Sequence, residues 1–155
     1  MAMQNLELSR DLRELLKCFL SHDVEFLIIG GHAVSYHGYP RFTKDLDVWI
    51  ERSEQNAIKI VAALREFGFD FDGLSSEMFT DEGRMTQMGL EPNRVDILHT
   101  IKGVEFRDCY TRSNYANVDG SSIPIISKAD LLLNKIATAR PQDLADAYQL
   151  QKSDF

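Results

Sequence analysis

The chain has 155 residues, of which 44% are hydrophobic and 26% are charged, and its formal net charge is −7. This is the composition of an ordinary globular protein that can bury a core, so we expect one domain over residues 1–155. The negative charge argues against broad nucleic-acid binding, which requires a basic face, but leaves room for a local basic groove.

The sequence predicts a cytoplasmic protein with no membrane partner. No apolar run approaches the roughly 20 residues that a membrane-spanning helix needs. The first residues lack the basic segment and following apolar segment of a secretory signal. Cys18 and Cys109 show no spacing typical of metal ligands, so we expect both to be reduced and to serve in packing.

The first expected elements are a helix and a short buried strand. Apolar residues recur at helical spacing over residues 6–20, with Ser9 as a candidate N-cap. The apolar run 26–29 indicates a buried strand because it ends in Gly30 and Gly31, which favour a tight turn.

These two glycines and the loop that follows predict an anion-binding corner. Glycine has no Cβ, so the backbone at Gly30 and Gly31 can approach an anion, and a helix starting at Ala33 would add unpaired N–H donors. Arg41 and Thr43 lie on the loop that leads into the next strand. The guanidinium of Arg41 suits phosphate oxygens, although it could instead only neutralise the neighbouring acids.

Two aspartates on the next expected strand predict a metal site. Side chains alternate along a strand, so Asp45 and Asp47 should project from the same face. Adjacent carboxylates repel one another, and a Mg²⁺ ion, which prefers oxygen ligands, would remove the conflict. The spacing alone is weak, because Asp70 and Asp72 repeat it in what we interpret as an ordinary turn.

A third acid is expected beside these two. Ser53 and Gly68 bound a predicted crossover helix, and residues 84–90 and 95–98 form a predicted hairpin around a turn at 91–93. Asp96 alternates with apolar neighbours on the second strand of this hairpin. If that strand lies next to the one that carries the other aspartates, three carboxylates converge.

The C-terminal part should add a hairpin and two helices. Asp119 and Gly120 separate two apolar runs, which is a strong hairpin signal. Ser127 is a candidate cap for a helix over residues 128–139, and Pro141 can open the last helix. The buried side of the first of these helices is expected to carry Leu131, Leu132, Leu133 and Ile136.

The order of these elements predicts an α+β (α/β-like) fold. A mixed central sheet with helices packed on it would be built from a core of about residues 20–126 and C-terminal helices over residues 127–153. In those helices Asp143 and Asp146 are three residues apart, and either could pair with Arg140 or Lys135.

These motif residues resemble those of a known family. The nucleotidyltransferase superfamily of DNA polymerase beta is similar in four features, namely Gly30-Gly31, a spacer of the same length, Asp45-Leu46-Asp47 and a later strand with Asp96. The segments 41–47 and 135–146 resemble the AbiEii and MenT branch, known as nucleotidyltransferase toxins or uncharacterised relatives. The resemblance covers residues 20–150 and implies a minimal nucleotidyltransferase fold without the further helical domain of AbiEii-like proteins.

This resemblance implies a transfer of a nucleoside monophosphate from a nucleoside triphosphate to an acceptor hydroxyl on RNA or tRNA, a protein or a small molecule. It also implies a toxin role with a cognate antitoxin as one setting for that reaction. Mg²⁺, or Mn²⁺ in its place, would be held by the catalytic acids Asp45, Asp47 and Asp96. The nucleotide would be bound by Gly30, Gly31, Arg41, Thr43 and Lys135. For Lys135, a solvated charged helix face is an equally good interpretation.

Two other classes of function compete with this one. A non-catalytic regulatory or antitoxin-like module could keep the fold and bind a nucleotide or a partner without turnover. The presence of all three acids argues mildly against such a module. A kinase-like or Rossmann-type nucleotide domain is disfavoured because neither of their glycine motifs surrounds Gly30 and Gly31.

Overall fold

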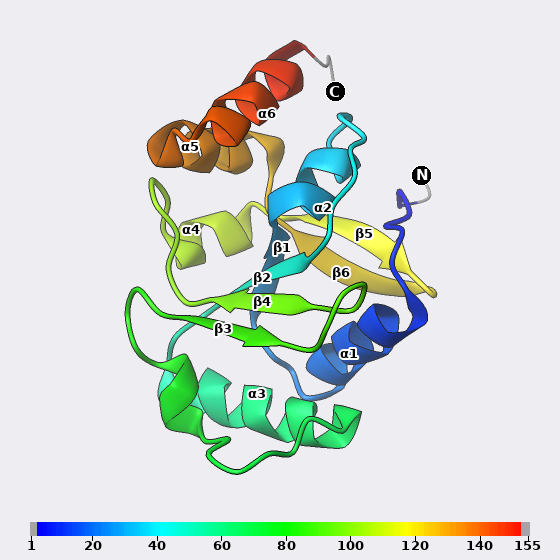
Figure 1. The fold of residues 1–155 in the computed structure, drawn as a ribbon, viewed down its shortest axis with the longest axis vertical. Helices are drawn as coiled ribbons and strands as arrows, with labels where there is room; N and C mark the ends of the chain where they lie inside the picture. Colours follow the sequence, from blue (N-terminus) through cyan, green and yellow to red (C-terminus); the bar gives the residue numbers. More distant parts are fainter. Residues whose placement is uncertain (1–2, 153–155) are drawn as a thin grey trace.

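The computed structural model describes residues 3–152, which form one mixed sheet with helices around it (Figure 1). The strands are β1 (Phe26–Ile29), β2 (Leu46–Ile50), β3 (Met85–Met88), β4 (Val95–Leu98), β5 (Asn114–Val118) and β6 (Ser121–Ile125). The helices are α1 (Arg10–Ser21), α2 (Gly30–Tyr36), α3 (Glu54–Phe67), α4 (Phe106–Thr111), α5 (Lys128–Thr138) and α6 (Pro141–Lys152), with a short 3-10 helix, η1 (Ser76–Phe79). Within this range no helix has both the length and the apolar run needed to cross a membrane.

The strands form a six-stranded sheet in the order β3-β4-β2-β1-β6-β5. β2 runs parallel to β4 and β1 runs parallel to β6, whereas the other neighbours are antiparallel. Helices and a mixed sheet together confirm the predicted α+β class. The two predicted hairpins are also confirmed, as β3–β4 and β5–β6.

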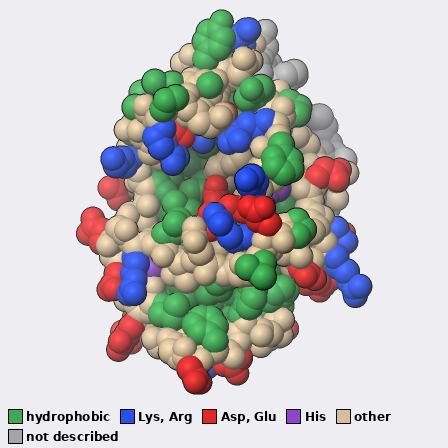
Figure 2. All heavy atoms as spheres, in the orientation of Figure 1, with side chains coloured by type: hydrophobic (Ala, Val, Ile, Leu, Met, Phe, Trp, Pro, Cys, Tyr) green, Lys and Arg blue, Asp and Glu red, His purple; other side chains and the backbone are tan. Residues whose placement is uncertain are grey.

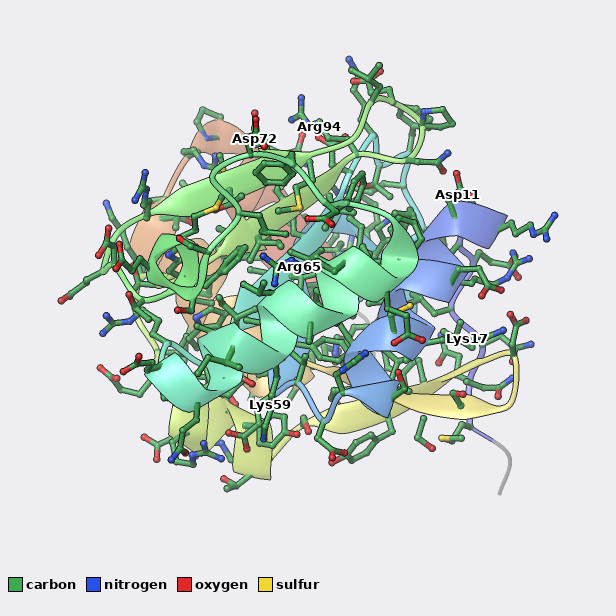
Figure 3. The ribbon with its side chains drawn as sticks, turned by 90° about the horizontal axis from the view of Figure 1, so that it is seen from below. Asp11, Lys17, Lys59, Arg65, Asp72 and Arg94 are labelled. Carbon is green, nitrogen blue, oxygen red and sulfur yellow. The ribbon has the colours of Figure 1, made fainter. Side chains whose placement is uncertain are left out.

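The main core lies between the sheet and two helices. α1 and α3 lie side by side over one face of the sheet (Figures 1 and 3). All four residues of β1 are buried, and Phe26 meets Phe19 of α1 in an edge-to-face contact with 5.4 Å between ring centroids. Burial of a side chain of this size contributes about 1.5–3 kcal/mol to the free energy of folding, so the four residues of β1 stabilise the core strongly. α5 and α6 pack on each other at the opposite end of the molecule from α3 (Figure 1).

The predicted helix ends are confirmed at three serines and one glycine. Ser9, Ser53 and Ser127 each accept a hydrogen bond from the backbone amide three residues further on. Each such cap is worth about 1 kcal/mol, because it pairs an otherwise unsatisfied amide. Gly68 ends α3 in the left-handed conformation, with φ at +115°.

The predicted buried side of α5 is partly wrong. Leu133 and Ile136 are 54% and 51% exposed, whereas Asp130, Asn134 and Lys135 are buried. The reason is that these polar residues find partners inside the protein, which the apolar pattern of the helix does not reveal. Asp130 forms an ion pair with Arg112, and the Asn134 side-chain amide donates to a backbone carbonyl.

Three boundaries also differ from expectation. α2 begins at Gly30 and not at Ala33, since Gly30 itself makes the turn from strand to helix. β2 begins at Leu46, so Asp45 lies just before the strand. The short helix α4, in a segment that showed no clear pattern, was not predicted.

Candidate active site

The turn between β1 and α2 leaves room for side chains from the next loop and strand. Gly30 has φ at +69°, and a Cβ at this position would lie 2.0 Å from Oδ2 of Asp47. A Cβ at Gly31 would lie 2.7 Å from Oγ1 of Thr43. Both distances are shorter than real Cβ atoms allow, so this corner requires glycine for side-chain approach as well as for the turn.

Asp47 and Asp96 are direct neighbours across two parallel strands. The register of β2 and β4 pairs Asp47 with Asp96, and paired residues of adjacent strands project from the same face. The two carboxyl groups are close enough for each to influence the pKa of the other. Asp96 therefore lies beside Asp47, which meets the condition on which the expected convergence of carboxylates depended.

Arg94 joins the remaining acid to this pair. Its Nη2 lies 2.7 Å from Oδ2 of Asp45, and its Nε lies 3.4 Å from Oδ1 of Asp96. Sequence reasoning missed Arg94. Its position two residues before Asp96 was the available signal, because residues at that spacing in an extended segment share a face.

The surroundings disfavour negative charge on two of the three acids. Burial, followed by the charges of Asp96 and Asp45, raises the pKa of Asp47 from 3.8 to about 7, although Lys135 opposes the shift. Burial also raises the pKa of Asp96, against the opposing effect of Arg94. Lys135 and Arg94 therefore compensate the negative charge of the pair only in part.

The acids present the kind of atoms that a hard cation binds. Over residues 3–152 no three acidic, His or Cys side chains are arranged as a ready-made metal site, and Asp45 is engaged by Arg94. Oδ1 of Asp45 and Oδ1 of Asp96 are nevertheless buried without a hydrogen-bond partner. Carboxylate oxygens that accept no hydrogen bond, next to an acid with a raised pKa, fit Mg²⁺ or Mn²⁺, which take oxygen ligands.

A cleft of about 670 Å³ opens beside the glycine corner. Figure 2 shows acidic side chains gathered in the hollowed centre of this face, with Lys and Arg side chains on several sides. The charged residues that line the cleft are Asp47, Asp143, Arg41, Lys102, Lys135 and Arg140. Four of these six lining residues are cations, in a chain of net charge −7, and cations in a cleft favour a polyanionic ligand.

Buried ion pairs fix the cationic wall. Nζ of Lys135 lies 3.3 Å from Oδ1 of Asp143 and 3.1 Å from Oδ2 of Asp146. Nη2 of Arg41 lies 3.2 Å from the same Asp146 oxygen, and Nε of Arg140 lies 2.6 Å from Oδ2 of Asp143. The predicted pairing of the two aspartates is confirmed, and the interpretation of Lys135 as part of a solvated face is wrong.

The same ion pairs keep Asp143 charged. Burial alone would raise its pKa, but hydrogen bonds from Arg140 and Thr138 and the charges of Lys135 and Arg140 outweigh burial and hold the pKa at about 2. Asp143 therefore stays a fixed anion at every physiological pH. It can orient Lys135 towards the cleft without changing its own charge.

The cleft brings together only part of the predicted site. Its lining includes five of the predicted residues, namely Gly30, Gly31, Arg41, Asp47 and Lys135. Asp45 and Asp96 lie next to it, connected through Arg94 and Asp47. The hydroxyl of Thr43 donates to the backbone carbonyl of Asp45 at 3.4 Å, and this side chain supports Gly31 from outside the cleft.

Replacing Gly30 by Ala is expected to destabilise the protein and to weaken nucleotide binding at least tenfold. The new Cβ would displace the Asp47 carboxylate, which lies 2.0 Å away. Gly120→Ala is the matched control, because Gly120 also has positive φ, at +85°, but has no atom within 4 Å of an added Cβ. Thermal unfolding and ATP titration of both variants measure the difference. Equal losses in both would show that backbone strain, about 1–2 kcal/mol, explains the whole effect.

Comparisons with known proteins agree with this geometry. The family described as nucleotidyl transferase of unknown function (DUF2204) matches residues 8–152. No curated protein has a significantly similar sequence.

Three solved structures share the fold at low sequence identity. A protein described as a nucleotidyltransferase (TM1012) from Thermotoga maritima is 16% identical with a TM-score of 0.54, and the match covers 92% of this chain and 89% of that one. The lincomycin-bound lincosamide antibiotic adenylyltransferase LnuA is 17% identical with a TM-score of 0.56, over 96% of this chain and 99% of that one. An antigenic nucleotidyltransferase-like protein from Paracoccidioides brasiliensis is 19% identical with a TM-score of 0.52, over 96% and 78% respectively.

The family match spans nearly the whole chain and includes the glycine corner, the paired aspartates and the cationic wall. The solved structures, all below 25% identity, support the fold. The AbiEii and MenT branch that the sequence resembles is not among these findings. The chain belongs to the nucleotidyl transferase family of unknown function (DUF2204).

Proposed function

We propose that this protein transfers a nucleoside monophosphate from a nucleoside triphosphate to an acceptor hydroxyl in a Mg²⁺-dependent reaction. The observation that carries the proposal is the position of Asp47. It lies in register with Asp96, against Gly30, and on the wall of a cleft whose other side is cationic. Acids on one side and fixed cations on the other suit a triphosphate bound together with a divalent ion.

The cationic wall would bind the phosphates. Lys135 is held by two aspartates, so its ammonium group can contact a phosphate without first being immobilised. Arg41 and Arg140 present planar guanidinium groups that can bind phosphate oxygens in pairs. Gly30 and Gly31 let the backbone of the turn approach the same ligand.

Asp45, Asp47 and Asp96 would hold the metal, with Asp45 exchanging its contact with Arg94 for the ion. When bound, Mg²⁺ would neutralise the phosphate charge and stabilise the oxygens that attack and leave. In the reaction the acceptor oxygen bonds to the α-phosphorus and the bond to pyrophosphate breaks. Asp96 is the residue proposed to orient the acceptor hydroxyl and accept its proton, because its Oδ1 accepts no hydrogen bond and its raised pKa suits a proton acceptor.

The binding of Mn²⁺ to the protein alone should strengthen with pH and level off above pH 7. Asp47 must lose its proton before it can bind a cation, and its pKa is about 7. Affinity should therefore rise about tenfold per pH unit below that value, since one proton is released per ion bound. Calorimetric titration between pH 5.5 and 8 measures this slope. Asp47→Asn is the control, because it has no carboxyl group to titrate at this position and should lose the pH dependence that Asp47 causes. A pH-independent affinity in the native protein would contradict the assignment of Asp47 as a ligand.

The acceptor is open among three classes. The structurally similar LnuA is a lincosamide adenylyltransferase, which makes a small-molecule hydroxyl one candidate. The resemblance of segments 41–47 and 135–146 to the AbiEii and MenT branch makes RNA, tRNA or a protein hydroxyl the candidate for a toxin with a cognate antitoxin. A non-catalytic regulatory module remains the competing function, because Asp45 is engaged by Arg94 in this structure.

One experiment separates these functions. The protein is mixed with Mg²⁺ and each of four α-³²P-labelled nucleoside triphosphates, in the presence of cell RNA, cell protein or a small-molecule extract. Label transferred to one acceptor class supports the proposal and identifies the class. Nucleotide binding without transfer to any of the three supports the regulatory module, and no nucleotide binding at all rejects both.

A further inference from the structure

Arg94, which is labelled in Figure 3 and directly precedes β4, contacts two of the three proposed metal ligands. Its Nη2 lies 2.7 Å from Oδ2 of Asp45, and its Nε lies 3.4 Å from Oδ1 of Asp96. Within residues 3–152 the third acid, Asp47, forms no ion pair of this kind. The guanidinium of Arg94 therefore supplies positive charge to two carboxylates that a divalent ion would also use.

The backbone of Arg94 is fixed, whereas its side-chain contacts can be exchanged. The carbonyl oxygen of Arg94 accepts a hydrogen bond from the backbone amide of Leu46 at 3.1 Å, which holds the residue against the start of β2. Nε of the side chain, in contrast, has no hydrogen-bond partner among the described residues, so its contact with Asp96 is electrostatic. The side chain is 34% exposed. Movement of the guanidinium away from Asp45 would thus break no backbone hydrogen bond.

Arg94 would compete with a divalent ion for Asp45. Two cations repel one another when both lie at ion-pair distance from one carboxylate, so the ion can bind Asp45 only after the guanidinium has left. In the described part of the chain the acids are not arranged as a metal site while Arg94 holds Asp45. An ion that arrives alone would deprive a partly buried guanidinium of its nearest anion, which is unfavourable. The structure therefore favours weak binding of the ion without nucleotide.

A bound triphosphate would offer the displaced guanidinium another anion. Asp47 lines the cleft with the cationic wall and is paired with Asp96 in the strand register. A phosphate that shares an ion with Asp47 would therefore lie near the two acids that Arg94 contacts. The planar fork of arginine suits phosphate oxygens as well as carboxylates, so the guanidinium can exchange one for the other.

We infer that Arg94 makes metal binding depend on the nucleotide. In the free protein Arg94 holds Asp45 and disfavours the ion, and in the presence of a triphosphate it exchanges Asp45 for a phosphate oxygen and releases Asp45 to the ion. The new contact is required for the coupling, because a ligand shifts an equilibrium only by the difference in its affinity for the two states. The inference rests on the proposed function and describes the regulation of the same site.

Binding measurements without any transfer reaction test this role. Calorimetry at pH 8 gives the affinity of Mn²⁺ for the protein alone, and the affinity of α,β-methylene-ATP, which cannot release pyrophosphate, with and without Mn²⁺. The ratio of the two nucleotide affinities measures the coupling between the ligands. The association of Mn²⁺ with the nucleotide in solution contributes equally for every variant, so it cancels when variants are compared.

Arg94→Gln removes the charge and keeps a hydrogen-bond donor beside the acids. Mn²⁺ alone should bind this variant at least about tenfold more tightly than the native protein, and the coupling with the nucleotide should fall at least about tenfold. Arg94→Lys restores a cation, although its ammonium group lacks the fork that reaches both acids, and should recover part of the coupling. Mn²⁺ binding no tighter in Arg94→Gln than in the native protein, or equal coupling in the two, would overturn the inference.

Lys44→Met is the matched control for charge. Lys44 directly precedes Asp45 but is exposed and forms no ion pair within residues 3–152, so its replacement should change either affinity by less than about threefold. Equal effects of Lys44→Met and Arg94→Gln would show that general charge explains the result, which would overturn the inference. Thermal unfolding establishes that each variant is folded. If Arg94→Gln is not, Arg94→Lys decides, and Mn²⁺ binding no tighter than in the native protein would overturn the inference there too.

Failure of this inference is distinct from failure of the proposed function. Label transfer by the native protein, together with equal coupling in native protein and Arg94→Gln, would leave the proposed function intact and overturn the role of Arg94. No binding of Mn²⁺ or of the nucleotide to the native protein would overturn both. The expected loss of coupling without label transfer to any acceptor would support the exchange at Arg94 and overturn the transfer reaction.

Discussion

Asp47→Asn is expected to abolish nucleotidyl transfer and, at the same time, to make the metal-free protein more stable. The loss of activity should be on the order of 1,000-fold, because the variant removes the carboxylate that connects the proposed metal, the glycine corner and the cationic wall. The gain in stability follows from the environment of the charge. Asp47 ionises beside Asp45 and Asp96 in a largely buried place, and Asn avoids that repulsion.

The sign of the stability effect depends on pH. The pKa of Asp47 is about 7 in the folded protein and 3.8 without these surroundings, so the folded state holds the extra proton between these values. This residue therefore favours folding most below pH 3.8, and that contribution is lost as the pH rises to about 7. At pH 8 the free energy of unfolding of Asp47→Asn should exceed that of the native protein by on the order of 2 kcal/mol, discounted for partial exposure.

Two measurements check this prediction. Thermal unfolding at pH 4 and pH 8 without metal should show a gap between variant and native protein that is larger at pH 8. The transfer assay should show activity lost in Asp47→Asn and retained in Asp72→Asn, which changes an exposed aspartate of the second Asp-x-Asp sequence (Figure 3). A variant that is both less stable at pH 8 and fully active would contradict the role given to Asp47.

The two hairpins and the faces from which Asp47 and Asp96 project could be predicted from the sequence, and there is a physical reason. The order of the strands, which pairs Asp47 with Asp96, depends on contacts between distant segments and entered the prediction only as a condition. Side-chain alternation and turn residues are local signals, and they assign each aspartate to a strand and a face. Gly30 was expected to serve backbone approach to an anion. The structure adds a second reason, which is the space that the Asp47 carboxylate occupies.

The environment of Lys135 could not be predicted in the same way. Its burial depends on ion pairs with Asp143 and Asp146 from the next helix. Asp146 is in turn paired with Arg41, from a loop about 100 residues earlier in the sequence. The apolar pattern of α5 favoured Leu133 and Ile136 for the core, and the structure exposes both. Contacts between distant segments therefore decide which face of the helix is buried.

Lys135→Met should destabilise the protein by about 3 kcal/mol, which is the typical cost of leaving a buried charge without its partner. Asp143 and Asp146 are 1% and 0% exposed, and Lys135 lies between them. Lys59→Met is the matched control, because Lys59 is exposed on α3 and its replacement should change stability by less than about 0.5 kcal/mol. Urea unfolding of both variants measures the difference, and equal stabilities would contradict the structural role of the ion pairs.

A double variant tests whether the uncompensated charge causes this loss. In Lys135→Met combined with Asp146→Asn, the positive and the negative partner are removed together, so the destabilisation should be smaller than the sum of the two single effects. Arg41 would lose its contact with Asp146 in the same variant, and its loop would no longer be held to α6. Nucleotide binding should therefore stay weak even where stability is partly restored. Full additivity of the single effects would mean that Lys135 and Asp146 stabilise the fold independently, and the ion pairs would then not account for the shape of the cationic wall.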